Sequence, residues 1–152
     1  MQTLEKTLWG LVKSHLPVGC DSQRIETGST GRGIPDVNLC WMGRDIWVEL
    51  KIVMGSRVSL RPEQVAWAYR RTKAGGTVWI LARDKFDGVR KGKGDRIFIW
   101  PGSCAADVLE NGIKAEGCYI FDAPFDWDSV MAVLWPEAQK TPLSANREGG
   151  AG

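Results

Sequence analysis

GIPDVNLCWMGRDIWVELK, residues 33–51, is the stretch of sequence that decides the fold. It contains two runs of alternating apolar and other residues, a pattern typical of β-strands. Strands are predicted over 36–41 and 44–53, joined by a two-residue turn at Met42–Gly43, where glycine adopts a positive φ without steric cost. With this turn Trp41 faces Arg44, and counting outward places Asp36 opposite Glu49.

The predicted hairpin carries three charged residues on one face. Because side chains alternate along a strand, Asp36, Glu49 and Lys51 share a face, opposite to the face of apolar residues. Paired residues have Cβ atoms roughly 4.5–5.5 Å apart, and like charges there are destabilising. A divalent cation offsets this repulsion, since Mg²⁺ is bound by one or two carboxylates with water and substrate phosphate. The pattern predicts a metal site for phosphodiester hydrolysis, in which the lysine orients the attacking water; a solvent-facing acid–lysine pair is the alternative.

The remaining elements extend the hairpin into an α/β domain. Helical spacing of leucines predicts a first helix over 2–16, and a short edge strand is expected at 23–27. Ser59 is a candidate cap for a helix that begins near Pro62 and ends at Gly75–Gly76. Further elements are expected in the order strand 77–83, strand 96–100, helix 103–111, and a last helix capped by Asp126 or Asp128. The prediction is one domain, residues 1–135, with helices covering a mixed sheet, followed by a disordered tail over 136–152.

Composition excludes several classes of protein. The chain has 152 residues, 43% apolar content and a formal net charge of +2, which indicate one globular domain. No apolar run approaches the roughly 20 residues of a membrane span, and the N-terminus lacks a signal-peptide pattern, so a cytoplasmic protein without a membrane partner is expected. Four scattered cysteines and a single histidine, His15, argue against a zinc site or a histidine nuclease. No phosphate-binding nucleotide loop is present, so no nucleotide cofactor is expected.

The charged residues of the hairpin carry a resemblance to a known superfamily. Pro35–Asp36, twelve residues, and then Glu49–Leu50–Lys51 resemble the motif of the PD-(D/E)xK nucleases. The entry GSTGRGIPD and the segment RPEQVAWAYRRTKAGGTVWIL are similar to those of archaeal-type Holliday junction resolvases and of VRR-NUC nucleases, which include phage proteins. The resemblance covers about residues 1–83 and implies a restriction-endonuclease-like core.

The resemblance also implies roles for individual residues. It implies that Asp36, Glu49 and the Leu50 carbonyl bind Mg²⁺, with Mn²⁺ as a substitute, and that Lys51 is the catalytic lysine. Glu5 matches an acid that these families bring to the metal, although it also fits an exposed helix charge. Gln64 matches a glutamine that borders the site. The implied activity is that of a metal-dependent endonuclease acting on branched DNA in recombination, repair or phage replication, and in resolvases the active unit is a homodimer.

Two segments are candidates for DNA contact. Arg24, Ser29 and Thr30 correspond to a phosphate-contacting region of the resolvases. The segment 83–96 contains six Lys or Arg against three Asp and is predicted to be a loop, in which Arg90, Lys91 and Lys93 are candidates for phosphate contact; a solvated loop is the alternative. The segment after residue 84 matches no known family pattern and is a candidate for selecting the DNA substrate. A catalytically silent binding module, or a nuclease that needs a partner protein, also fits the sequence.

Overall fold

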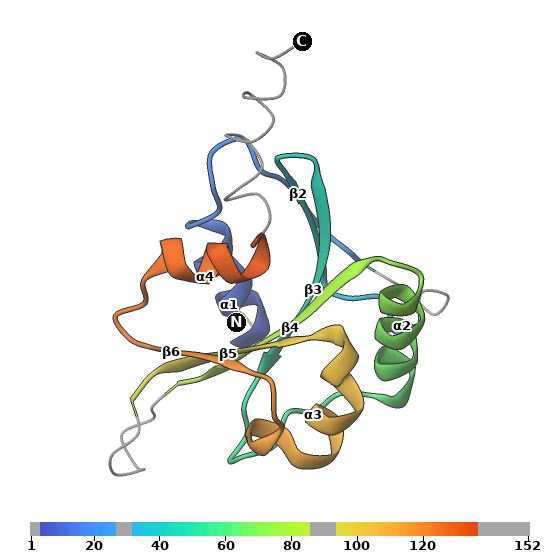
Figure 1. Cartoon of the computed structure of the whole chain (residues 1–152). Helices are drawn as coiled ribbons and strands as arrows, with labels where there is room; N and C mark the ends of the chain where they lie inside the picture. Colours follow the sequence, from blue (N-terminus) through green and yellow to red (C-terminus); the bar gives the residue numbers. More distant parts are fainter. Residues whose placement is uncertain (1–3, 27–31, 86–93, 137–152) are drawn as a thin grey trace.

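The computed structural model describes residues 4–26, 32–85 and 94–136. It has the predicted α/β architecture, a single six-stranded mixed sheet in the order β1-β2-β3-β4-β5-β6 with helices on both faces (Figure 1). The strands are β1 (Asp21–Arg24), β2 (Val37–Trp41), β3 (Arg44–Ile52), β4 (Thr77–Asp84), β5 (Arg96–Pro101) and β6 (Tyr119–Asp122). The helices are α1 (Leu4–Lys13), α2 (Pro62–Lys73), α3 (Ala105–Asn111) and α4 (Trp127–Leu134), with short 3-10 helices η1 (Gly102–Cys104) and η2 (Gly112–Lys114). No helix among the described residues is long and apolar enough to cross a membrane.

The hairpin has the predicted register. Trp41 pairs with Arg44 and Val37 with Val48, so Asp36 and Glu49 are the next residues in the same register, just beyond the paired part of β2. The turn residues Met42 and Gly43 both have positive φ, at 50° and 75°. A primed turn of this kind matches the twist of the two strands, which is why the two-residue loop fixes the register.

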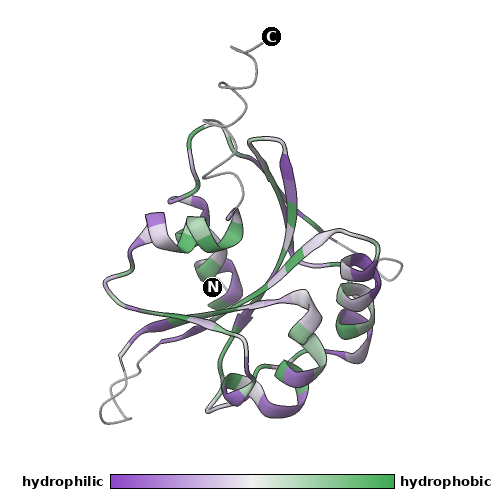
Figure 2. Cartoon of the chain, in the orientation of Figure 1, coloured by the Kyte–Doolittle hydropathy of each residue, from purple (hydrophilic) through white to green (hydrophobic). Residues whose placement is uncertain are grey.

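The connection from β3 to β4 passes through α2 and makes these two strands parallel, while the other neighbouring pairs are antiparallel. Each face of the sheet buries its own apolar cluster. Leu8 and Val12 of α1 pack with Leu50 and with α4 residues on one face. Ala68 of α2 and Val108 of α3 pack with β4 and β5 residues on the other. Figure 2 shows hydrophobic residues along the central strands and a mixture of hydrophobic and hydrophilic residues on α1, α2 and α3.

Several boundaries differ from the sequence-based expectation. Residues 14 and 15 form a turn, so α1 ends before the predicted residue 16, and β1 lies earlier than 23–27. Ser59 is not the cap of α2, because the buried Leu60 separates it from the helix and Arg61 occupies the N-cap position. Asp126, rather than Asp128, caps α4 by accepting a hydrogen bond from the Ser129 N–H.

The predicted loop over 83–96 is shorter than expected. Arg83 belongs to β4 and Arg96 to β5, and each is used within the fold. Arg83 forms a bidentate ion pair with Asp95, at 2.6 and 2.9 Å, and Arg96 lies 3.6 Å from the buried Asp84. Two of the six basic residues in this segment are therefore committed to acidic neighbours. Arg90, Lys91 and Lys93, together with the predicted tail beyond Pro136, lie outside the described residues.

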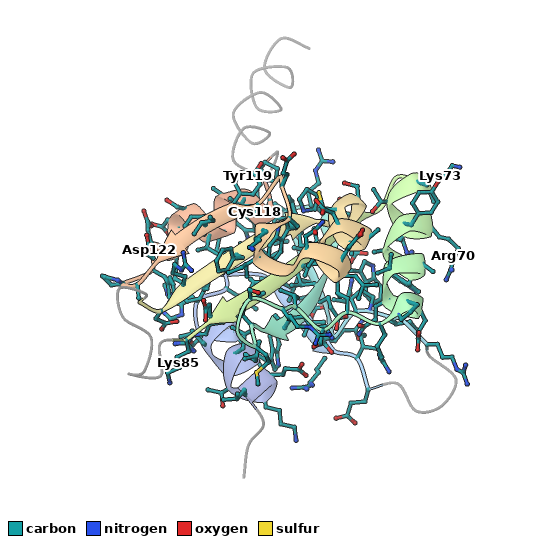
Figure 3. All side chains as sticks on the ribbon, turned by 90° about the horizontal axis from the view of Figure 1, so that it is seen from below. Arg70, Lys73, Lys85, Cys118, Tyr119 and Asp122 are labelled. Carbon is teal, nitrogen blue, oxygen red and sulfur yellow. The ribbon has the colours of Figure 1, made fainter. Side chains whose placement is uncertain are left out.

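The edge strand β6 was not predicted from the sequence. Its residues Tyr119 and Ile120 are about half exposed, so the strand lacks the alternation of buried and exposed residues that identifies a half-buried strand. Figure 3 shows Cys118 and Tyr119 at the start of β6, on the side of the molecule away from α2, from which Arg70 and Lys73 project outward. Strand β6 therefore forms through pairing with β5 rather than through a local pattern of its own.

Candidate functional site

The candidate site lies where β3 continues past the start of β2. Strand β2 begins at Val37, whereas β3 runs on through Glu49, Leu50 and Lys51 to Ile52. Asp36 occupies the position just before β2 and accepts a hydrogen bond from the Leu50 N–H at 2.8 Å. An extended residue directs its N–H and C=O to the same side. The Leu50 carbonyl therefore faces the Asp36 side of β3, in keeping with its predicted role as an oxygen ligand.

Glu49 and Lys51 are buried, although the alternative interpretation of the sequence placed them on a solvated surface. Glu49 is 4% exposed and Lys51 is 9% exposed. The Lys51 Nζ lies 3.5 Å from the Glu49 Oε1, which places the two side chains on the same face of β3. That face is covered by α2 and α3, because Glu49 is paired across the sheet with Ile80, a member of the cluster beneath these helices. The solvent-facing alternative is therefore wrong.

Helix α2 contributes Gln64, which is 7% exposed. The Gln64 Nε2 donates to the Glu49 Oε1 at 2.9 Å, and its Oε1 accepts from the backbone N–H of Arg61 at 2.8 Å. One side chain thus satisfies an otherwise free N–H at the start of α2 and fixes the orientation of the Glu49 carboxyl group. The sequence placed Gln64 at the border of the site; the structure brings it into direct contact.

The second oxygen of Glu49 has no partner within the part of the chain that the structure describes. Glu49 Oε2 is buried there and accepts no hydrogen bond from these residues. The space behind the carboxyl group is a cavity of about 10 Å³ lined by Leu60, Ala68, Ile80 and Ala105 among other residues, which is room for about one water. An unpaired charge at this place is unfavourable. Burial is the main cause that raises the pKa of Glu49 to about 9; the negative charge of Asp36 raises it further, and the Lys51 charge opposes both.

This donor set fits a hard divalent cation. Asp36 and Glu49 provide carboxylate oxygens, Leu50 a carbonyl oxygen, and Glu49 Oε2 is an acceptor to which no described residue donates. Mg²⁺ prefers oxygen ligands and is held by one or two carboxylates plus water and phosphate oxygens. Among the residues that the structure describes, no three acidic, histidine or cysteine side chains lie close enough to share one ion. A cation here would complete its shell with water or substrate.

Glu5 is on the other side of the sheet. It lies in the first turn of α1, whose buried residues Leu8, Trp9 and Val12 pack against the face opposite to Glu49. The structure does not gather Glu5, Asp36 and Glu49 into one cluster. The role of Glu5 as a metal ligand stays a prediction. To reach the ion, the Glu5 side chain would have to pass around the start of β2, where β3 continues without its partner strand.

The entry to the site is shaped by a glycine that the sequence analysis did not single out by itself. Gly33 has φ of +80°, and a Cβ at this position would lie 2.1 Å from the Glu63 carbonyl oxygen. The loop before Asp36 is therefore pressed against the first turn of α2. A glycine two residues before a Pro–Asp pair was the available signal, but the contact with a helix 30 residues later was not visible in the sequence.

The predicted DNA-contacting residues are placed only in part. Arg24 is exposed on β1 and pairs with Val37, so its side chain lies on the face of the sheet that α1 covers, opposite to Glu49. The backbone of the next residue is near the site, because the Ile25 N–H donates to the Asp36 carbonyl at 2.7 Å. Ser29 and Thr30 lie outside the described residues. The contact of Arg24 with DNA stays a prediction.

Comparisons with known proteins found similarity to solved structures, but not to a family or a curated protein. No family model and no curated protein matches the chain. The fold is similar to that of Hjc, a Holliday junction resolvase from the archaeal hyperthermophile Archaeoglobus fulgidus, with a TM-score of 0.43, 14% sequence identity, and coverage of 79% of this chain and 86% of that chain. A similarity of this extent does not identify an activity.

Proposed function

We propose that this chain is a metal-dependent nuclease that hydrolyses phosphodiester bonds in DNA. The observation that carries the proposal is the half-buried Asp36 beside the buried Glu49 and Lys51, where Glu49 Oε2 has no hydrogen-bond partner among the described residues. Two facing acids repel each other when both are ionised, and a bound cation relieves that repulsion. The preference for branched DNA rests on the sequence resemblance to archaeal-type resolvases.

The residues have distinct roles in this mechanism. A bound Mg²⁺ would supply a Lewis acid for the phosphoryl oxygen and lower the pKa of a bound water. Asp36 and Glu49 would hold the ion, and Gln64 orients the Glu49 carboxyl group through its 2.9 Å hydrogen bond. Lys51, which lies 3.5 Å from Glu49, would orient the attacking water and stabilise the negative charge that develops on the phosphate.

The proposal is tested by cleavage of a matched set of labelled DNAs: four-way junction, flap, splayed arm, linear duplex and single strand. Each is incubated with Mg²⁺, Mn²⁺ or EDTA and with wild type, Glu49→Ala or Lys51→Ala. We expect metal-dependent cleavage by the wild type and a loss of at least 100-fold in both variants, as for removal of a group that stabilises transition-state charge. Full activity of either variant would refute the assigned site.

The outcomes also separate the remaining interpretations. Symmetric cuts at the junction indicate a resolvase, whereas cleavage of other substrates keeps the site and changes the role. Binding of the junction without cleavage in any metal would support a silent binding module or a missing partner protein. The implied homodimer is tested in the same samples by sedimentation with and without junction DNA, because a 16.8 kDa species in both would contradict it.

A further inference from the structure

A polar cleft lies beyond the end of β3, apart from the cavity behind Glu49. It has a volume of about 440 Å³ and is lined by Ser56 and Arg57 from the β3–α2 loop and by Glu110, Asn111 and Lys114 from α3 and η2, with Leu109 and Gly112 between them. Figure 1 shows the end of α3 and the turn after it beside this loop. The second wall comes from the part of the sequence that matched no family pattern.

The walls of the cleft are held firmly together. The Ile113 N–H donates to the Ser56 carbonyl at 3.0 Å. A Cβ at Gly112 would lie 2.0 Å from the same carbonyl oxygen, so the two backbones are in direct contact. Met54 and Arg57 exchange two backbone hydrogen bonds of 3.0 Å, which fix the loop at its turn. The cleft is therefore a preformed feature, bordered by rigid backbone on both sides.

The charges in the cleft favour an anion. Arg57 and Lys114 are both exposed, and neither forms an ion pair with any residue that the structure describes. Glu110 is the single acid in the lining, so the cations outnumber it by two to one. The Ser56 hydroxyl adds an uncharged donor, whereas the Asn111 amide donates to the Asp107 carboxylate at 2.6 Å. Arginine and lysine with neutral donors are the usual ligands of backbone phosphates in nucleic acids.

The cleft is on the same side of the sheet as the catalytic residues. Leu60 at the end of the loop and Ala105 at the start of α3 both line the cavity behind Glu49. Met54 is hydrogen-bonded to Arg57 of the cleft, and from Lys51 to Met54 the chain advances about 10 Å at roughly 3.3 Å per extended residue. This value approximates the separation between the catalytic lysine and the cleft. One strand of duplex DNA rises about 3.4 Å per phosphate along the axis, so the separation corresponds to about three phosphates.

From these observations we infer that the cleft between Arg57 and Lys114 binds a backbone phosphate of the nucleic acid on which the enzyme acts, a few nucleotides from the cleaved bond. This inference rests on the proposed nuclease function. It assigns residues 109–114 a part in substrate binding, in addition to the residues near Asp36. The negative charge of Glu110 weakens the binding of the phosphate. Removal of this charge should therefore strengthen DNA binding, whereas removal of the two cations should weaken it.

The test is equilibrium binding of labelled four-way junction and linear duplex, followed by fluorescence anisotropy in EDTA at several salt concentrations. The proteins are wild type, the double variant Arg57→Gln/Lys114→Gln, Glu110→Gln, and Lys13→Gln as a control on α1, which covers the opposite face. The affinity falls with salt, and each phosphate contact contributes about −0.9 to the slope of log K against log salt. We therefore expect the double variant to have a slope smaller in magnitude by about 1 and to bind DNA about tenfold more weakly.

Glu110→Gln is expected to bind more tightly, by about twofold to fivefold, because it removes the acid beside the two cations. Lys13→Gln is expected to match the wild type. Thermal unfolding of each variant verifies that its fold is retained, and all four positions are exposed, so little change is expected.

The inference is overturned if the wild type binds and cleaves DNA while the double variant has the same affinity and salt slope. A lower DNA affinity of Glu110→Gln than of the wild type would also count against the inference. A general disturbance of the cleft, rather than its charge, would then explain the data. If the wild type neither binds nor cleaves any of the DNAs, the proposed function fails and this inference fails with it. The wild-type result therefore distinguishes the two failures.

Discussion

The buried carboxyl group of Glu49 predicts that this protein loses stability as the pH rises in the absence of metal. Burial first, and the Asp36 charge second, raise the pKa of Glu49 to about 9 from its ordinary value of 4.5. Between these two values the folded protein holds a proton that the unfolded chain releases. The free energy of unfolding therefore falls with rising pH across this window and is constant, with respect to this group, below 4.5 and above 9.

The magnitude follows from the linkage relation. One proton more in the folded state gives a slope of about −1.4 kcal/mol per pH unit, so the contribution between pH 6 and pH 8 is about −3 kcal/mol. Because Glu49 is 4% exposed, screening by solvent reduces this value little. Against a total stability of about 5–15 kcal/mol, such a change is readily measured.

The matched variant is Glu49→Gln, which resembles the protonated acid and retains the acceptor for the Gln64 Nε2. Urea unfolding in EDTA at pH 6, 7 and 8, followed by tryptophan fluorescence, gives the free energy of unfolding of both proteins. We expect the wild type to lose about 3 kcal/mol more than the variant between pH 6 and pH 8. Parallel pH curves for the two proteins would refute the assignment of a raised pKa to Glu49.

Three further predictions concern the same region. Because Mg²⁺ needs the ionised carboxylate, binding at pH 7 should release about one proton per site in wild type but none in Glu49→Gln, as measured by calorimetry in buffers of different ionisation enthalpy; equal release from both proteins would contradict this. Gln64→Ala removes two hydrogen bonds of a buried side chain and should cost about 2 kcal/mol in urea unfolding, whereas Gln23→Ala, on the exposed edge strand, should cost less than about 0.5. Gly33→Ala should cost about 2–4 kcal/mol, since both its φ and the Glu63 carbonyl oppose a Cβ, while Gly43→Ala, which has positive φ in open space, should cost about 1; similar values for the two would show that the contact with α2 yields without strain.

The sequence by itself determined the hairpin and the face on which its charged residues lie. Side-chain alternation and a two-residue turn are local properties, so the pairing of Trp41 with Arg44 followed from the sequence and was confirmed. The order of the strands and helices other than β6, and hence the α/β class, followed for the same reason. Element ends were less well determined, as at Ser59, because packing of Leu60 rather than cap preference decided where α2 begins.

Only the tertiary structure decided which helices cover which face. The α2 connection between parallel strands places Gln64 over Glu49, whereas α1 places Glu5 on the opposite face. The same placement buries Glu49 and raises its pKa, an effect of the whole environment rather than of neighbouring residues in the chain. The cleft between Arg57 and Lys114 joins segments more than 50 residues apart, and no local pattern records such a contact. The periodicity of a strand determines to which face of the sheet a side chain points. The groups that surround this side chain depend on which distant helices and loops the tertiary fold places over that face.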